Sequence, residues 1–362
     1  MKDPLVIPAQ EAIAQLERFD AILDARSPTE FADDRLPGAA STPVLDDAQR
    51  ALVGTIYRQR SPFEARRIGA ALVSRNIAAL LEERLADKPR EWRPLVYCWR
   101  GGNRSGSLAT VLARVGWRTA VLDGGYRAFR RQVLDDLGCW PEGLRLQVLA
   151  GRTGAGKTLL LQRLAATGMQ VLDLEAIAEH RGSVLGLMPE AVQPSQKQFE
   201  TRLWQALRRF DPARPVLVES ESRRVGRCHL PDALISAMRE APCVRLDAPA
   251  AVRAGLLLRE YRHFTTDRAL LFERLERLVP LHGHRQVDAW KAMADAGDWE
   301  AFVESLLDLH YDPAYDRSIG RNYRRIGEAA TVSLDSADEA ALQEAVRAVA
   351  AAAGYDGSGA VA

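Results

Sequence analysis

Short hydrophobic runs alternate with longer segments of helical pattern through the first part of the chain. Residues 19–24, 94–97 and 119–122 form mainly apolar runs that end at polar or reactive positions, which predicts three buried strands. The segments 63–86 and 126–136 carry the pattern of helices. A strand followed by a helix and then another strand is typical of a parallel sheet with helices on both faces.

The residues after the first predicted strand have the signature of a helix start. Ser27 precedes Pro28, and Glu30 stands at the third helical position. A serine N-cap with an acidic residue three positions later forms a capping box, and proline is favoured at the first helical position. We therefore expect a short helix directly after this strand.

The same alternation of strand and helix patterns returns in the second part of the chain. Residues 145–150, 169–173, 215–219 and 242–247 form short apolar runs, and helical patterns separate them. Glycine and proline interrupt the stretch 137–143, just before the first of these runs. The pattern predicts an α/β protein with two parallel-sheet domains.

Length and composition agree with two domains. We expect the first domain to cover residues 1–140 and the second residues 141–350, while the Ala/Gly-rich residues 351–362 predict a disordered tail. A chain of 362 residues fits roughly 100–200 residues per domain. With 47% hydrophobic and 27% charged residues, it has the composition of an ordinary globular protein.

Several classes of protein are excluded by the residues themselves. The N-terminal residues lack the apolar run of a signal peptide, and no apolar stretch approaches the roughly 20 residues of a membrane helix. We therefore expect a cytoplasmic protein without membrane contact, and a monomer.

The cysteines are widely spaced, without a C-x-x-C pair, which argues against a metal held by Cys and His and against a disulfide framework. They are Cys98, Cys139, Cys228 and Cys243.

Arginines gather in the second half although the net charge of the chain is only +1. Arg223, Arg224 and Arg227 lie close together, and Arg262 belongs to a second group. The guanidinium fork suits the phosphates of nucleic acids, whereas a GC-rich genome would also enrich arginine. We treat these four arginines as candidate nucleic-acid contacts.

A glycine-rich loop follows the first predicted strand of the second domain. Its residues Gly151, Gly154, Gly156, Lys157 and Thr158 fit the pattern G-x-x-x-x-G-K-[ST] at every fixed position. In this P-loop motif, backbone N–H groups and a helix N-terminus bind phosphate oxygens, the lysine reaches the terminal phosphates, and the hydroxyl is placed to bind Mg²⁺. The loop predicts a phosphorylated ligand, with Mg²⁺ as a candidate ion, and leaves open which group the phosphates carry.

Two acidic residues end neighbouring predicted strands. Asp173 and Glu219 are candidates for the acid that helps a P-loop to hold its metal or phosphate, and a solvated acid at a strand end is an equal alternative for each. Glu219 also opens the segment 219–224, which is unusually polar after an apolar strand. We interpret this segment as a functional loop.

A second loop begins directly after another buried strand. Cys98 is followed by Arg100, by the adjacent Gly101 and Gly102, and by Arg104. The glycines allow the loop to curl with its amide groups pointing inward. A ring of N–H groups closed by an arginine stabilises a thiolate, lowers the cysteine pKa and makes the thiol a nucleophile.

Two chemistries use a loop of this shape. Cys-x5-Arg-Ser is a phosphatase signature, in which the loop binds the phosphate that the cysteine attacks. Rhodanese-like enzymes carry sulfur or selenium on the cysteine of a similar loop. A phosphatase fused to an NTPase therefore remains an alternative, and so does a nucleotide-switched RNA-binding module without cysteine chemistry.

The sequence resembles a known family in several places. Residues 23–39 resemble the opening of a rhodanese domain, and residues 97–105 resemble the active loop of one rhodanese subfamily. A rhodanese domain joined directly to a P-loop domain is similar to the tRNA 2-selenouridine synthase family, which residues 310–315 also resemble. The resemblance extends from about residue 17 to residue 345. Asn103 departs from the methionine expected within the loop, which puts the packing of the loop in question.

The resemblance implies a rhodanese-like domain followed by a P-loop NTPase-like domain, and it implies a reaction. Enzymes of this family replace the sulfur of wobble 2-thiouridine in certain tRNAs with selenium from selenophosphate. The implied route runs through S-geranyl-2-thiouridine, made from geranyl diphosphate.

The same resemblance assigns roles to the two loops. The P-loop would hold the prenyl diphosphate, and Cys98 would carry selenium as a perselenide. The partner would be tRNA, held by the arginines through its phosphates. Tyr261, Tyr315 and Tyr323 are candidates for stacking on an exposed base, although a core position is favoured for each.

Overall fold

Two compact units make up the chain. The structure is a computed structural model that describes residues 3–182, 186 and 192–355. The first unit comprises Met1–Asp136 with Glu200–Gln205, and the second comprises Leu137–Phe199 with Ala206–Ala362. The break after Asp136 lies near the boundary expected at residue 140. Within the described residues, no helix is long and apolar enough to cross a membrane.

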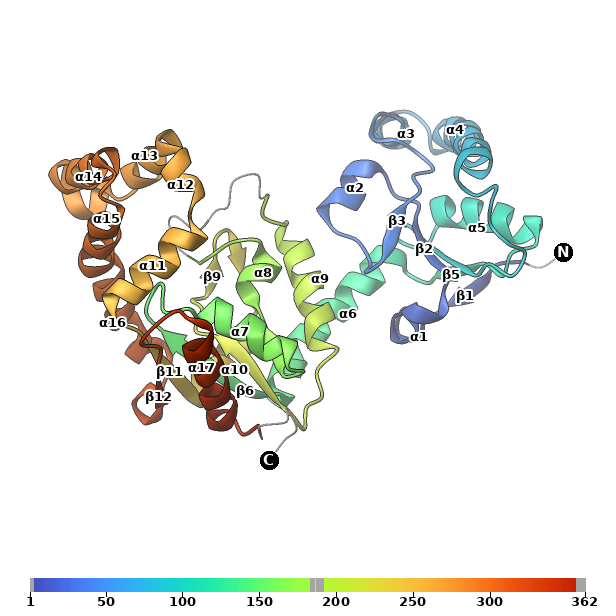
Figure 1. Ribbon diagram of the computed structural model, residues 1–362. Coiled ribbons are helices and arrows are strands. Elements are labelled where there is room, and N and C mark those ends of the chain that lie inside the picture. Colours follow the sequence, from blue (N-terminus) through green and yellow to red (C-terminus); the bar gives the residue numbers. More distant parts are fainter. Residues whose placement is uncertain (1–2, 183–185, 187–191, 356–362) are drawn as a thin grey trace. The chain divides into compact units, whose positions relative to one another are not determined.

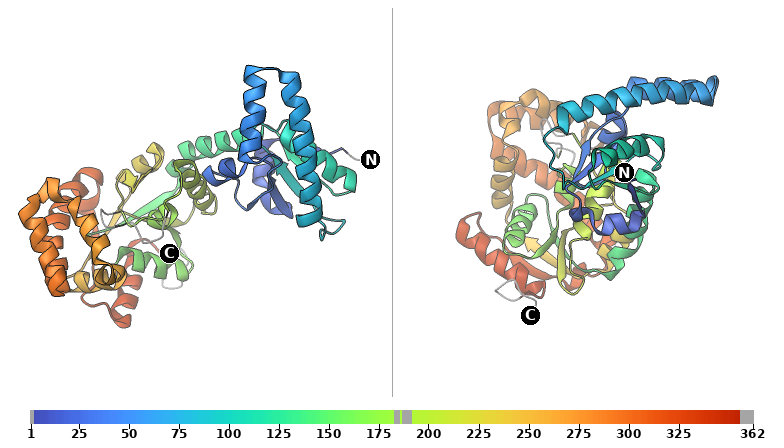
Figure 2. Two further views of the ribbon diagram at one scale, coloured as in Figure 1. Left: turned by 90° about the horizontal axis from the view of Figure 1, so that it is seen from above. Right: turned by 90° about the vertical axis from the view of Figure 1, so that its right-hand side faces the viewer.

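The first unit is built around a five-stranded parallel sheet with the strand order β1-β5-β4-β2-β3 (Figure 1). Two helices, α3 and α4, pack side by side as a long pair (Figure 2). The elements in chain order are β1 (Leu5–Ile7), α1 (Ala9–Ala14), η1 (Leu16–Arg18), β2 (Ala21–Asp24), α2 (Pro28–Asp33), β3 (Ala39–Ser41), α3 (Asp47–Gln59), α4 (Pro62–Arg84), β4 (Pro94–Tyr97), α5 (Asn103–Val115), β5 (Ala120–Leu122) and α6 (Gly125–Cys139).

Strand β4 lies at the centre of this sheet, and all four of its residues are buried. It pairs in parallel with β2, so that Asp24 lies opposite Tyr97 where both strands end. Because parallel strands end at the same edge, the loop that begins at Cys98 lies at this edge, as the run 94–97 predicted. The sequence analysis did not predict the edge strands β1 and β3, in which no residue is fully buried.

A buried polar network fixes the ends of β2 and β4. The guanidinium of Arg26, which is 1% exposed, donates through Nε to Asp24 Oδ1 at 3.0 Å and through Nη2 to Asp24 Oδ2 at 2.6 Å. The hydroxyl of Tyr97 donates to the same carboxylate at 2.6 Å. Arg26 also donates to the carbonyl oxygen of Asp34 at 2.6 Å. The charges are paired and hydrogen-bonded, which is the condition for burying them.

Segment Glu200–Gln205 belongs to the first unit although it lies far along the chain. Thr201 donates to Asp34 Oδ2 at 3.0 Å, and Trp204 donates to Asp136 Oδ2 at 2.7 Å. These are long-range contacts, which the order of elements along the sequence does not reveal.

The second unit contains a five-stranded parallel sheet in the order β12-β11-β6-β8-β7 and a two-stranded hairpin, β9 with β10. Its elements are η2 (Trp140–Gly143), β6 (Arg145–Gly151), α7 (Lys157–Ala166), β7 (Gln170–Leu172), α8 (Leu174–Ala178), α9 (Gln196–Leu207), β8 (Pro215–Glu219), β9 (Arg224–Val225), β10 (Cys228–His229), α10 (Asp232–Glu240), β11 (Cys243–Asp247), α11 (Ala250–Glu260), α12 (His263–Thr266), α13 (Arg268–Glu276), α14 (Val279–Ala296), α15 (Trp299–Leu306), the π-helical turn η3 (Leu307–Tyr311), α16 (Asp312–Asn322), η4 (Ile326–Glu328), β12 (Ala330–Ser333) and α17 (Glu339–Ala352).

Two hydrophobic cores of this unit lie within the part of the chain that the structure describes. One lies against the sheet and includes Leu149, Leu161 and Leu246. The other is built by the helices α11 to α15, which gather on one side of the unit in Figure 1, and is centred on buried residues such as Leu275 and Trp290.

The first residues of the predicted tail are ordered. Helix α17 continues to Ala352, and Tyr355 is 3% exposed. The Tyr355 hydroxyl donates to the carbonyl oxygen of Pro215. The prediction of disorder from residue 351 is therefore wrong for residues 351–355, because one aromatic anchor outweighs the Ala/Gly composition around it. Residues 356–362 lie outside the described residues.

Candidate active sites in the two units

The first candidate site is the loop between β4 and α5. Cys98 begins it and is 3% exposed, and the Ser105 hydroxyl donates to its Sγ at 3.1 Å. The amide of Tyr126 donates to the carbonyl oxygen of Cys98 at 2.8 Å, which joins the start of α6 to the loop. A Cβ atom at Gly125 would lie 2.3 Å from that oxygen. Only glycine fits there, so α6 is built to hold the loop closed.

Several groups around the thiol favour its charged form. Burial acts to raise the pKa of Cys98, but hydrogen bonds from the Ser105 hydroxyl and from the amides of Ser105 and Arg100 lower it, as does the charge of Arg104. The sum places the pKa of Cys98 below its ordinary value. The loop therefore holds a thiolate more readily than a free cysteine would, which is the property a nucleophile needs.

Arg104 is held by a carboxylate that the sequence analysis did not assign to the site. Its Nη1 lies 2.6 Å from Glu30 Oε2, and both side chains are largely buried. The Ser27 amide donates to the same Glu30 oxygen at 3.1 Å, which is half of the predicted capping box. Burial alone would raise the pKa of Glu30, yet Arg104 and the Ser27 amide hold it below its ordinary value. The capping box was the available signal for Glu30.

The remaining loop residues have simpler settings. Gly101 has φ +68°, and a Cβ there would lie 2.9 Å from the carbonyl oxygen of Leu122. Gly102 is the N-cap of α5, and Arg100 is exposed. Asn103 is exposed at the first position of α5, so its departure from methionine changes no buried contact of the loop.

The second candidate site is the P-loop, which joins β6 to α7 as the motif requires. Gly154 and Gly156 have φ values of +78° and +86°, which other residues rarely adopt. Lys157 Nζ donates to the carbonyl oxygen of Gly151 at 2.7 Å, so the ammonium lies inside the curve of the loop. A Cβ at Gly151 would lie 2.8 Å from the carbonyl oxygen of Leu246, so this position also requires glycine.

Carboxylates surround the lysine end of this loop. The Thr158 hydroxyl donates to Glu175 Oε2 at 3.2 Å, and the Glu175 amide donates to Glu219 Oε1 at 2.8 Å. Glu219 is 3% exposed, and its Oε2 is buried without a hydrogen-bond partner in the described structure. Burial and the charge of Asp173 raise the pKa of Glu219 well above its ordinary value. Glu219 therefore lies where a P-loop acid is expected, and Glu175 is a neighbour that the sequence analysis missed.

The carboxylate of Asp173 caps a helix and makes no hydrogen bond to the P-loop in the described structure. Its carboxylate accepts the Ala176 amide at 2.8 Å and so caps α8. No group of three or more His, Cys, Asp or Glu side chains is arranged to hold a metal ion within residues 3–182, 186 and 192–355. Thr158, Glu175 and Glu219 are the residues that would lie beside a Mg²⁺ ion bound with the phosphates.

A buried ion pair supports the P-loop from outside the motif. Arg253, which is 4% exposed, makes two hydrogen bonds of 2.7 Å to the carboxylate of Asp312. The same guanidinium donates to the carbonyl oxygen of Thr153 at 3.2 Å. Asp312 belongs to the segment 310–315 that carried part of the resemblance, so that segment acts here by positioning the loop.

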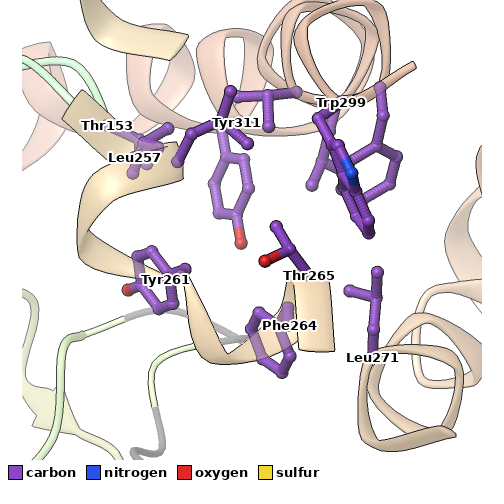
Figure 3. Close-up of a pocket in the computed structure, with 12 residues that line it drawn as sticks. Thr153, Leu257, Tyr261, Phe264, Thr265, Leu271, Trp299 and Tyr311 are labelled. Atoms are coloured by element: carbon purple, nitrogen blue, oxygen red, sulfur yellow. The ribbon is translucent and has the colours of Figure 1, made fainter. Parts of the chain in front are cut away.

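An apolar pocket begins at the P-loop itself (Figure 3). Thr153 and Leu257 lie at one end, and Leu257 packs against Gly154, since a Cβ at Gly154 would lie 2.8 Å from its Cδ1. The opposite end is formed by Leu271 and Trp299. The rest of the lining consists mainly of aromatic and aliphatic side chains, among them Tyr261, Phe264, Val303 and Tyr311. The P-loop and the pocket together offer a polar end and an apolar body.

The candidate nucleic-acid contacts are exposed. Arg223, Arg224 and Arg227 lie on and beside the β9–β10 hairpin, and Arg262 precedes α12. Three of them have side-chain contacts within the protein. Arg223 pairs with Asp232, Arg224 donates to the Gly226 carbonyl at 3.4 Å, and Arg227 donates to the Gln193 carbonyl. Of the three tyrosines considered for base stacking, Tyr323 is 3% exposed and donates to the Glu221 carbonyl at 2.7 Å, which makes it a core residue.

These features define a class of protein before any relative is considered: a cysteine-loop α/β domain followed by a P-loop α/β domain with an apolar pocket. Comparison with protein families gives the same division. Residues 8–132 match the rhodanese-like domain, and residues 144–276 match the tRNA 2-selenouridine synthase AAA domain.

Relatives extend the match over nearly the whole chain. The tRNA 2-selenouridine synthase of Aeromonas salmonicida is 34% identical over 84% of this chain and 89% of its own length. That of Shewanella loihica is 33% identical over 89% of this chain and 93% of its own. The chain belongs to the tRNA 2-selenouridine synthase family.

Proposed function

We propose that this protein converts wobble 2-thiouridine of tRNA to 2-selenouridine through an S-geranyl intermediate, with geranyl diphosphate and selenophosphate as co-substrates. The observation that carries the proposal is the apolar pocket that begins at Thr153 of the P-loop. A P-loop alone would accept any diphosphate. An adjoining pocket lined by side chains such as Leu257, Phe264 and Trp299 favours an apolar group on that diphosphate over a sugar and base.

The first step is the transfer of the geranyl group. The bond between C1 of the geranyl chain and the diphosphate oxygen breaks, and diphosphate leaves with the electron pair. Sulfur of 2-thiouridine forms the new bond to C1, and the base loses its N3 proton. The amides of Gly151–Thr158 and the ammonium of Lys157 stabilise the negative charge that develops on the diphosphate, and a Mg²⁺ ion beside Thr158 would add to this.

The second step exchanges sulfur for selenium. Selenium adds at C2 of the base, the C2–S bond breaks, and geranylthiolate leaves. The Cys98 thiolate attacks the phosphorus of selenophosphate, the P–Se bond breaks, and selenide leaves to add to the base. Water then hydrolyses the S-phosphocysteine to inorganic phosphate, so no oxidant is needed. Cys98 is the thiolate that we assign to selenium delivery, with Arg100, Gly101, Gly102 and Arg104 forming the anion-binding ring around it. The lowered pKa of Cys98 supports this role.

The phosphatase alternative receives less support from the geometry. A cysteine phosphatase needs a protonated acid beside the loop to protonate the leaving group. Glu30 lies at the loop, but its pKa is lowered and its carboxylate is occupied by Arg104 at 2.6 Å. A carboxylate held in the charged form by an arginine is not suited to be a general acid.

Binding of tRNA is assigned to the exposed arginines. Arg223, Arg224, Arg227 and Arg262 offer guanidinium groups to the phosphate backbone, a contribution that is independent of sequence and sensitive to salt. If an arginine contacts a phosphate, its replacement by alanine should reduce the slope of log K for tRNA binding against log salt concentration by about 1.

Nucleoside mass spectrometry after incubation with tRNA, geranyl diphosphate and selenophosphate tests the two steps separately. Cys98→Ser should retain S-geranyl-2-thiouridine formation and lose 2-selenouridine. Lys157→Ala should lose geranylation, whereas tRNA geranylated beforehand should still be selenated. Cys139→Ser and Lys291→Ala change an exposed cysteine and an ion-paired surface lysine, and serve as matched controls. Normal 2-selenouridine formation by Cys98→Ser would remove the thiolate from the mechanism.

A further inference from the structure

The apolar pocket has an end that lies away from the P-loop as well as the end at Thr153. Figure 3 shows Leu271 and Trp299 at the end away from Thr153. Trp299 is the first residue of α15, and Leu271 comes from the neighbouring helix α13. Residues of two different helices therefore form the end of the pocket that lies farthest from the P-loop.

The helical core backs this end of the pocket, with Leu271 inside the core and the partly buried Trp299 packed against it. Leu271 is 1% exposed. Trp299 packs edge-on against Phe302, with ring centroids 6.2 Å apart, and Phe302 is itself 4% exposed. Close-packed interiors resist the insertion of extra methylene groups. A ligand longer than the pocket would have to displace these side chains.

The polar end fixes where the ligand starts. A diphosphate bound by the P-loop is held by backbone amides and by Lys157, so the first carbon of any attached chain begins near Thr153 and Leu257. If one end of a ligand is anchored at the P-loop, the side chains at the other end of the pocket limit how long an attached chain can be. A shorter chain leaves apolar surface uncovered, and a longer chain meets the wall.

We propose that Trp299 and Leu271 form the wall that determines which prenyl chain length is transferred, so that the C10 geranyl chain is preferred over the C5 dimethylallyl and C15 farnesyl chains. This inference rests on the proposed function, because it assumes that a prenyl diphosphate occupies the P-loop. It assigns the selectivity to side chains of the pocket and not to the P-loop, which contacts only the diphosphate.

Competition between prenyl diphosphates tests the wall. The protein is incubated with 2-thiouridine tRNA and equal concentrations of dimethylallyl, geranyl and farnesyl diphosphate, and the S-prenyl nucleosides are quantified by mass spectrometry. Trp299→Ala and Leu271→Ala should each raise the farnesyl-to-geranyl ratio by about tenfold or more, since discrimination by a few methylene groups in an apolar pocket reaches roughly 10–200-fold.

A variant that makes the pocket smaller provides an independent test if Trp299→Ala or Leu271→Ala disturbs folding. The Thr265 side chain points into the middle of the pocket in Figure 3. Thr265→Phe should fill that space and shift the preference from geranyl towards dimethylallyl. Leu309→Ala removes a 44% exposed apolar side chain from the neighbouring turn and should leave every ratio unchanged.

Binding without tRNA supplies a second readout. Isothermal titration with geranyl and farnesyl S-thiolodiphosphate, which resist transfer, should show the farnesyl analogue gaining affinity in Trp299→Ala. Unchanged chain-length ratios in folded Trp299→Ala, Leu271→Ala and Thr265→Phe would overturn the wall while leaving prenyl transfer intact. Absence of prenyl transfer from all three diphosphates in the wild type would instead overturn the proposed function.

Discussion

The hydroxyl of Ser105 lies 3.1 Å from Sγ of Cys98 and donates a hydrogen bond to it. Both side chains are buried, at 0% and 3% exposure. A hydrogen bond to a buried sulfur is worth more to the thiolate than to the thiol, because the charged acceptor has no water to replace the donor. Ser105 is therefore the side chain through which α5 adjusts the chemistry of the loop.

Removal of this donor should make Cys98 less reactive near neutral pH. We expect Ser105→Ala to raise the pKa of Cys98 by about 1–2 units, because a hydrogen bond to a charged group contributes about 1.5–3 kcal/mol and 1.36 kcal/mol corresponds to one unit. The rate of iodoacetamide alkylation of Cys98, followed by peptide mass spectrometry from pH 5 to 10, measures this shift. Ser107→Ala, on an exposed position of the same helix, is the control. Identical pH profiles for Ser105→Ala and the wild type would contradict the assigned donor.

The ion pair between Glu30 and Arg104 should contribute to stability in a pH-dependent way. The pKa of Glu30 is lowered from 4.5 in the folded protein, so the carboxylate is favoured by folding. Its contribution is fully present above the unfolded value and is lost as the pH falls through the folded value. We expect Glu30→Gln to cost about 1–3 kcal/mol at pH 7 and much less near pH 3, measured by urea unfolding.

An exposed acidic residue provides the comparison for Glu30. Glu64 lies 3.9 Å from Arg60 and both side chains are at least 36% exposed. Glu64→Gln should cost no more than about 0.5 kcal/mol at either pH. Equal, pH-independent losses in the two variants would show that the Glu30–Arg104 pair does not stabilise the fold through charge.

The chemistry of both loops could be predicted because it is local in sequence. Cys98 and Arg104, like Gly151 and Lys157, lie within eight residues of one another, and the strands before them are continuous apolar runs. Local spacing therefore determines the shape of each loop, and the structure places each loop between a strand and a helix as expected. The same holds for the capping box at Ser27 and Glu30.

The apolar pocket could not be predicted in the same way. Thr153, Leu271 and Trp299 are brought together by packing among α11, α13 and α15, and an amphipathic pattern shows that a helix has a buried face without showing what the face meets. For the same reason, Arg253 looked like one of several basic residues, and only its 2.7 Å contacts with Asp312 reveal a buried ion pair.

That ion pair makes a strong prediction. Asp312→Asn would leave the guanidinium of Arg253 buried without its counter-charge, and we expect a loss of about 3–5 kcal/mol in the free energy of unfolding. Asp316→Asn is the matched control, since Asp316 pairs with Arg152 at 2.7 Å but both side chains are more than 40% exposed. It should cost at most about 1 kcal/mol. The free energy of unfolding of both variants is measured in guanidinium chloride. A similar small loss in both would show that the Arg253–Asp312 pair is not needed for stability.

A glycine substitution at the start of α6 should damage the cysteine loop without touching the P-loop. Gly125 has φ +57°, and a Cβ there would lie 2.3 Å from the Cys98 carbonyl oxygen and 2.5 Å from the Gly101 amide. Gly125→Ala must therefore push the loop away from α6. We expect a stability loss of about 1–3 kcal/mol and at least a tenfold fall in 2-selenouridine formation, with geranylation unchanged.

The same substitution at the other end of α6 isolates this effect. Gly138 is exposed, and a Cβ there would meet nothing within 4 Å. Gly138→Ala should leave both reactions unchanged and stabilise the protein by about 0.5–1 kcal/mol, because alanine is the better helix former. Thermal unfolding and nucleoside analysis of the two variants side by side measure the contrast. Normal selenation in folded Gly125→Ala would mean that the loop does not need the contact with α6, since the displaced amide ring would then still serve Cys98.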